Sequence, residues 1–179
     1  GILDGTISQE EEERYLKIVS NEVKRLARLV SSMLNLSKIE AGEISIAPTD
    51  YDISKQIFET LLSFEKRIDE GRINIEGFED MGFVAVKADR DLLQQVIYNL
   101  IDNAVKFTPE NGTLRIEIRK SKQDNKYKVC IYNTGIGIKE EELPYIFDRF
   151  YRVDKARSRS SGGTGLGLAI AKEIINAHG

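Results

Sequence analysis

The chain has 179 residues, a net charge of −3 and a pI near 5.4. Hydrophobic residues make up 41% and charged residues 31%, a composition that excludes a disordered or low-complexity chain. The nearly balanced charge argues against a nucleic-acid-binding protein, and no apolar run reaches the roughly 20 residues that a membrane span needs. The single cysteine, Cys130, excludes an internal disulfide and a cysteine-rich zinc site. Because the chain begins with Gly1 and not Met, we expect it to be part of a longer protein.

The first predicted element is a helix from Gln9 to about Ile39, a stretch without Gly or Pro. Ser8 and Glu11 form a capping box at its start, and Ala41-Gly42 ends it. Apolar residues recur along the helix at spacings of three and four: Leu16, Val19, Val23, Leu26, Val30 and Met33. Further apolar residues widen this stripe: Tyr15, Ile18, Leu29, Leu34 and Leu36. So wide a stripe favours one helix of a bundle, and the alternative is an ordinary surface helix packed on the rest of the chain.

Beyond a linker at residues 42–50, predicted helices and strands alternate. A helix is expected from about Asp52 to Glu70 with Gly71 as its C-terminal cap, followed by short strands at 73–75 and 83–86. Asp89 is a suitable N-cap for a helix that runs to Phe107, and residues 113–119 and 127–132 alternate like the strands of a hairpin. The last helix covers about 165–177. This order predicts an α+β fold, with a helical layer against a mixed or antiparallel sheet.

The predicted helix 89–107 carries a polar stripe. Asn99, Asn103 and Lys106 are spaced so that they share one face, whereas most of the other positions are apolar. Amide oxygens are hard ligands that can hold Mg²⁺, and a lysine can bind a phosphate. The alternative is a solvated helix face.

Two glycine-containing segments flank a possible lid. Asn133-Thr134-Gly135-Ile136-Gly137 follows a strand, where two glycines permit a sharp turn and the approach of a planar base; a plain strand-ending turn is the alternative. Residues 162–168 form a glycine-rich loop that enters a helix, an arrangement that binds phosphate at the helix N-terminus. Residues 139–161 lie between them and include Arg152, Arg157 and Arg159, which could reach a triphosphate or belong to a solvated loop.

Together these segments resemble the four sequence boxes of sensor histidine kinases. Residues 99–107 resemble the N box, 133–137 the G1 box, 147–152 the F box and 163–168 the G2 box. The helix before Gly42 is similar to the second helix of that family's dimerisation domain. The resemblance implies an N-terminal long helix of a four-helix-bundle dimerisation domain (residues 1–42), followed by a Bergerat-type ATP-binding α/β sandwich (residues 43–179).

The resemblance implies a site for ATP and Mg²⁺. Asn103 would coordinate the metal with Asn99 close by, and Lys106 and Arg152 would meet phosphates. Further residues would surround the nucleotide: Phe107, Asn133, Gly135, Gly137, Tyr151, Thr164, Gly165, Leu166 and Gly167. These positions would bind substrate and stabilise charge, and none is expected to be a catalytic residue in its own right.

The resemblance also implies partners. The parent would be a homodimer that autophosphorylates on a histidine and passes the phosphate to an Asp of a response regulator receiver domain. The chain would be the cytoplasmic domain of a membrane-anchored bacterial sensor and would not itself insert into a membrane.

Three departures from the family qualify these expectations. The phosphoacceptor helix is missing, and His178 is expected to be a structural or capping histidine, so this chain alone should not phosphorylate itself. The family continues past the position of Gly179 into two further strands, which predicts a C-terminally truncated domain. The G1 box begins with Asn133 where the family has Asp, which predicts retained but weaker adenine binding.

Two other functions remain open. One is a gyrase-, Hsp90- or MutL-like ATPase, although those families carry a water-activating Glu where this chain has Asn99. The other is a non-catalytic dimerisation or regulatory module that has kept the fold.

Overall fold

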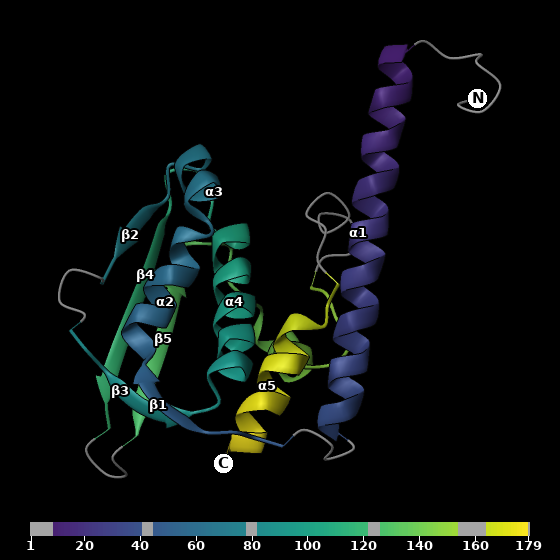
Figure 1. The fold of residues 1–179 in the computed structure, drawn as a ribbon. Coiled ribbons are helices and arrows are strands. Elements are labelled where there is room, and N and C mark those ends of the chain that lie inside the picture. The colour runs from purple at the N-terminus through teal and green to yellow at the C-terminus, as the bar shows by residue number, and fades with distance from the viewer. Residues whose placement is uncertain (1–8, 41–44, 78–81, 122–125, 154–163, 179) are drawn as a thin grey trace.

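The structure is a computed structural model that describes residues 9–40, 45–77, 82–121, 126–153 and 164–178. One long helix stands beside a body in which helices cover a layer of strands (Figure 1). This arrangement confirms the predicted α+β class.

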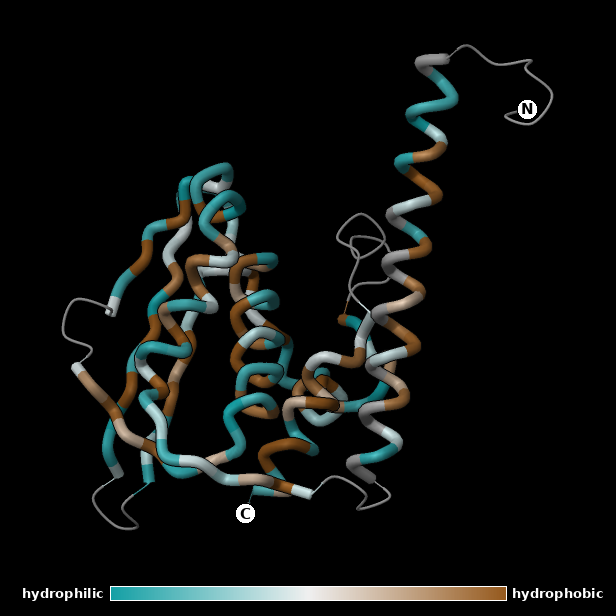
Figure 2. Tube along the Cα trace, in the orientation of Figure 1, coloured by the Kyte–Doolittle hydropathy of each residue, from teal (hydrophilic) through white to brown (hydrophobic). Residues whose placement is uncertain are grey.

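The long helix, α1 (Gln9–Glu40), forms as predicted from its sequence. Figure 2 shows hydrophobic positions recurring along it. Leu29 packs against a cluster that includes residues of the last helix. The other apolar residues with described side chains are 46–59% exposed: Tyr15, Leu16, Ile18, Val19, Val23, Leu26, Val30, Met33 and Leu34. Within the described residues, this stripe is therefore mostly uncovered. Ser8, Ala41, Gly42 and the side chain of Leu36 lie outside what the structure describes.

The strands form two small sheets. In the first, β1 (Thr49–Asp52) pairs antiparallel with β3 (Ala85–Ala88). In the second, the order is β2 (Asn74–Glu76), β4 (Thr113–Lys120), β5 (Tyr127–Asn133), with β2 parallel and β5 antiparallel to β4. The predicted hairpin and mixed sheet are confirmed. The structure adds β1, which begins at the end of the expected linker and runs to the expected start of the next helix, and it places β3 two residues later than predicted.

The prediction of one helix from Asp52 to Glu70 was wrong in one respect. The segment forms two helices, α2 (Ile53–Leu62) and α3 (Glu65–Glu70). Ser63 and Phe64 each donate their N–H to the carbonyl three residues back, at 3.1 and 2.9 Å, which tightens and ends the turn. Because the helix is interrupted here, the Phe64 side chain lies in the core, where it is 3% exposed. Gly71 does cap α3.

Two hydrophobic clusters lie on either side of α4 (Arg90–Phe107). The first, between the sheet and helices α2 and α4, contains the fully buried Ile57, Ile101, Leu114 and Ile116. The second joins α4 to α5 (Gly167–His178) through Val96, Leu166, Ile170 and Ile174. The central helix is thus fixed from both sides, and its polar stripe is held in one orientation.

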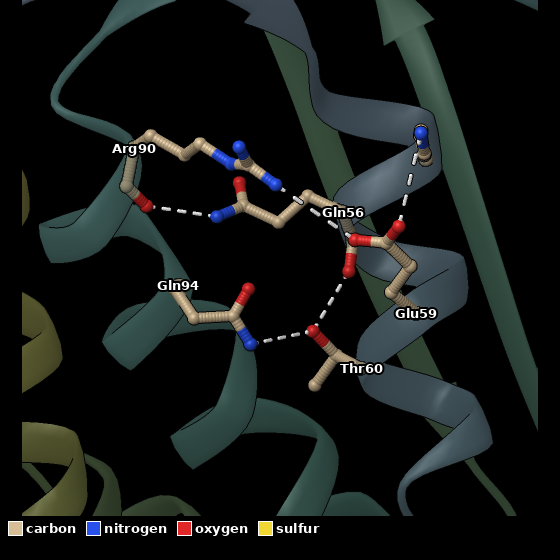
Figure 3. Close-up of polar contacts among 6 residues, drawn as sticks. Gln56, Glu59, Thr60, Arg90 and Gln94 are labelled. Carbon is tan, nitrogen blue, oxygen red and sulfur yellow. Dashed lines mark hydrogen bonds and ion pairs between the residues drawn. The ribbon is translucent and has the colours of Figure 1, made fainter.

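A polar seam joins α2 to the first half of α4 (Figure 3). Gln56, which is 2% exposed, donates through Nε2 to the Arg90 carbonyl oxygen at 2.8 Å. The Thr60 hydroxyl donates to the Gln56 carbonyl at 2.7 Å and accepts from Gln94 Nε2 at 2.9 Å. Arg90 also pairs with Glu59 at 3.9 Å. Because buried polar groups are costly when unpaired, this seam fixes the register of α2 on α4.

Asp89 holds three segments at the start of α4. Its Oδ1 accepts from the N–H groups of Asp91 and Leu92, both at 3.1 Å, and its Oδ2 accepts from Ala47 N–H at 3.0 Å. The Asp89 N–H donates to His178 Nε2 at 3.2 Å, and His178 Nδ1 lies 2.8 Å from the Ile174 carbonyl oxygen. These contacts confirm the predicted N-cap and the structural role expected of His178.

Candidate functional site

The polar stripe of α4 faces the start of α5. Asn99 Nδ2 donates to the Gly167 carbonyl oxygen at 3.2 Å. A Cβ added to Gly167 would lie 3.4 Å from Asn99 Cγ, so the two segments are in close contact. Asn103, one turn later, is half-buried, and within the described part of the chain its amide has no hydrogen-bond partner. A half-buried amide without a protein partner is suited to a ligand.

Lys106 completes the stripe in a mainly positive environment. Its ammonium nitrogen lies 4.9 Å from the centroid of the Phe107 ring. Burial lowers the pKa of Lys106 most, the charges of Arg152 and Arg67 lower it further, and Asp102 opposes them. Three cations and one carboxylate thus meet at the end of α4, and this balance favours an anion such as phosphate.

The loop after β5 packs against the end of α4. A Cβ added to Gly135 would overlap the Phe107 carbonyl oxygen and lie 2.7 Å from Asn133 Nδ2. Thr134 closes the hairpin beneath the loop, because its N–H donates to the Thr113 carbonyl at 3.1 Å and its hydroxyl accepts from Thr113 N–H at 2.9 Å. The residues expected to surround adenine are therefore adjacent to Phe107. The exposed Asn133 side chain is available to a ligand.

The start of α5 is tied to the segment that follows β5. Phe150 N–H donates to the Gly165 carbonyl at 2.9 Å, and Gly165 has a φ of +73°. A Cβ there would lie 2.8 Å from the Phe150 backbone, so this contact requires glycine. The Thr164 hydroxyl accepts from Leu166 N–H at 3.3 Å. Leu166 is fully buried in the α4–α5 cluster, so its side chain anchors the loop and does not face a ligand.

Tyr151 and Arg152 lie at the end of the described part of the expected lid. This part contains a short 3₁₀ helix, Glu140–Tyr145. The rings of Tyr151 and Tyr145 are 5.8 Å apart. Burial raises the pKa of Tyr151, and the nearby Glu142 adds to the shift. Arg157, Arg159 and Gly163 lie outside the described residues.

Three segments thus meet the second half of α4, through contacts of Gly167 with Asn99, of Gly135 with Phe107, and of the Arg152 charge with Lys106. Gly165 in turn ties the start of α5 to Phe150. Among the described residues, no cluster of three or more His, Cys, Asp or Glu could hold a metal. A metal here would be held by amide oxygens together with the oxygens of a bound phosphate, a donor set that suits Mg²⁺.

Sequence reasoning missed two charged residues at this site, Arg67 of α3 and Asp102 of α4. Arg67 NH1 lies 2.6 Å from Asp102 Oδ1. Asp102 could have been noticed because it precedes Lys106 by four residues on the same helix. Arg67 could not, since nothing local relates α3 to α4.

Comparison with known proteins places this geometry in a family. Residues 88–179, just over half of the chain, match the model of the histidine kinase-, DNA gyrase B- and HSP90-like ATPases. The chain belongs to this ATPase family. The matched residues include α4, the β4–β5 hairpin and α5, which carry the polar stripe and both glycine segments.

Similar proteins within this ATPase family are sensor histidine kinases. The chain is 37% identical to the sensor histidine kinase WalK of Bacillus subtilis over 93% of its own length and 27% of that protein. It matches the structure of the Acinetobacter baumannii histidine kinase AdeS with a TM-score of 0.77 at 28% identity, covering 99% of this chain and 79% of the other. A complex of the histidine kinase ThkA with the response regulator protein TrrA matches with a TM-score of 0.68 at 27% identity, covering 89% of this chain and 46% of that one.

The chain spans less than a third of the WalK sequence. No helix in the described ranges has the length and apolar character required to cross a membrane.

Proposed function

We propose that this chain is the ATP-binding catalytic part of a two-component sensor histidine kinase. The observation that carries the proposal is the contact of both glycine segments with the second half of α4, the half that carries Asn99, Asn103 and Lys106. Asn99 also bears on the choice between transfer and hydrolysis, because an amide cannot act as the general base that an ATPase needs to activate water.

The residues of α4 would hold the polyphosphate end of the nucleotide. The amide oxygens of Asn103 and Asn99 would coordinate Mg²⁺, which neutralises phosphate charge when bound. Asn99 suits this role because its Nδ2 already donates to the Gly167 carbonyl, which leaves its Oδ1 as the group that can coordinate a metal. Lys106 and Arg152 would bind the phosphates and stabilise the charge that develops during transfer.

The loop after β5 would bind the base. Asn133 Oδ1 would accept from the adenine amino group, and the close approach of Gly135 to the Phe107 carbonyl would keep this loop against the pocket. Gly137, with a φ of +70° and no atom within 4 Å of an added Cβ, would leave room beside the base. The Phe107 and Tyr151 rings would line the nucleotide.

The whole protein would work as a homodimer. The exposed stripe of α1 would lie in a four-helix bundle, with the catalytic body bringing ATP to the phosphoacceptor histidine. The phosphate would then pass to a response regulator, as the ThkA–TrrA complex suggests for a protein of this kind. The parent would be a membrane-anchored sensor with this part in the cytoplasm.

Calorimetric titration of the purified chain with Mg²⁺ and a non-hydrolysable ATP analogue tests the proposal. We expect saturable binding that Asn103→Asp weakens at least tenfold, and the exposed Asn176→Asp on α5 is the matched control. Absence of binding by wild-type protein with a cooperative thermal transition would refute nucleotide binding and favour a non-catalytic module. Steady hydrolysis of ATP without an acceptor protein would instead favour a gyrase-like ATPase.

A further inference from the structure

One charged residue reaches the edge of the candidate site from outside the segment that the family model matches. Arg67 belongs to α3, which lies beside the second half of α4 (Figure 1). Its NH1 lies 2.6 Å from Asp102 Oδ1, and its guanidinium carbon lies 5.3 Å from the centroid of the Phe64 ring. That ring in turn lies 5.1 Å from the ring of Tyr98 on α4. Arg67 is therefore held by both a charge and an aromatic face.

Asp102, the partner of Arg67, is also placed on α4 where it could form an ion pair with Lys106. An acidic residue four positions before a lysine is the favourable order for an ion pair along a helix, and Asp102 stands in this relation to Lys106. In the described structure, however, these two residues form no ion pair. The carboxylate binds Arg67, and the Lys106 ammonium lies over the Phe107 ring.

We propose that Arg67 is a positioning residue for Lys106: by occupying the Asp102 carboxylate it prevents an Asp102–Lys106 ion pair and leaves the ammonium available to a nucleotide phosphate. The inference rests on the proposed function. Arg67 acts through Asp102 and does not itself touch the nucleotide. The electrostatics of the site agree, because Asp102 and Arg67 shift the pKa of Lys106 in opposite directions.

A double-mutant cycle tests this arrangement. Calorimetry would measure the affinity for a Mg²⁺-bound non-hydrolysable ATP analogue in wild type, Arg67→Gln, Asp102→Asn and the double variant. Glutamine keeps part of the stem that packs on Phe64 and removes the charge. We expect Arg67→Gln to weaken binding about two- to fivefold, the size of one partly exposed ion pair. Asp102→Asn should bind at least as tightly as wild type, and the double variant should match Asp102→Asn.

The affinity of the double variant distinguishes a positioning role of Arg67 from direct contact with the phosphate. If Arg67 bound the phosphate itself, the double variant would remain as weak as Arg67→Gln, and the proposal would be overturned. Wild-type affinity in Arg67→Gln would overturn it as well. The matched control is Lys66→Ala, which removes a positive charge from the neighbouring position of α3, where the ammonium pairs with Glu70 at 3.8 Å. An equal loss in this variant would mean that the charge of α3 acts nonspecifically, and it would also overturn the proposal.

A second readout needs no nucleotide. Titration of ¹³C-labelled lysine side chains by NMR reports the pKa of Lys106. Among the described residues, the charges that shift this pKa are those of Asp102, Arg67 and Arg152. Arg67→Gln should raise this pKa, because the freed carboxylate then pairs with the ammonium, and adding Asp102→Asn should abolish the rise. If the wild-type chain did not bind nucleotide, the proposed function would be refuted. The titration would still show whether Arg67 keeps Asp102 from pairing with Lys106. An unchanged Lys106 pKa in Arg67→Gln would overturn that role.

Discussion

The contact between Gly135 and the end of α4 can be tested by adding one methyl group. A Cβ at Gly135 would overlap the Phe107 carbonyl oxygen, lie 3.3 Å from the carbonyl carbon and lie 2.7 Å from Asn133 Nδ2. Of these atoms, only the Asn133 amide lies on a side chain that can rotate away, so the loop must move from the helix. Overpacking of this kind costs about 1–3 kcal/mol. We therefore expect Gly135→Ala to lower the free energy of unfolding by that amount.

The same displacement would move the loop that we assign to adenine, so the affinity for an ATP analogue should fall as well. Urea unfolding followed by circular dichroism measures the first effect, and calorimetry measures the second. Gly82→Ala is a suitable control, because no atom lies within 4 Å of its added Cβ. If Gly135→Ala were as stable as Gly82→Ala and bound the analogue like wild type, the loop could not lie against Phe107 as the structure shows.

Three further predictions concern single side chains. Asn133→Asp should strengthen binding of an ATP analogue about fivefold in calorimetry, because a carboxylate makes a stronger bond to the adenine amino group than an amide does, and unchanged affinity would count against contact with the base. Thr60→Val should lower the free energy of unfolding in urea by about 1–2 kcal/mol, since Gln94 loses its acceptor in the buried seam; a neutral result would show that the seam adds no stability. Hydrogen bonds from Ala47 and Leu92 lower the pKa of Asp89, so its stabilising effect is present above the unfolded value near 3.9 and is lost as pH falls through the lower folded value. Asp89→Ala should therefore cost about 1 kcal/mol at pH 7 and clearly less at pH 2.5, and an equal cost at both values would contradict this reasoning.

Elements with local signals were predictable from the sequence. The cap at Asp89, the apolar period of α4 and the alternation in β4 and β5 are each formed by residues that are near neighbours in the sequence. Each of these elements formed as expected. The break between α2 and α3 was not predictable, because Phe64 fits the apolar period of a continuous helix and also the core position it takes after the break. Strand β1 was missed because its stabilising partner, β3, is distant in the sequence.

The candidate site shows the same division. Its motifs lie within short segments and could be read directly, including the stripe formed by Asn99, Asn103 and Lys106. Their mutual packing could not, since the contacts of Gly135 with Phe107 and of Gly165 with Phe150 depend on how separate segments fold together. The Arg67–Asp102 pair is the clearest case, because it joins residues 35 positions apart without any local pattern.

Asp89 links three separate segments, whose amide hydrogens should therefore exchange together. Ala47 N–H and Leu92 N–H donate to it, and Asp89 N–H donates to His178. Because release of the start of α4 removes the acceptor of both Ala47 and Leu92, neither amide can keep its protection once that turn opens. The segment leading from α1 into the body should therefore exchange its Ala47 amide hydrogen together with the first turn of α4, as part of one cooperative unit.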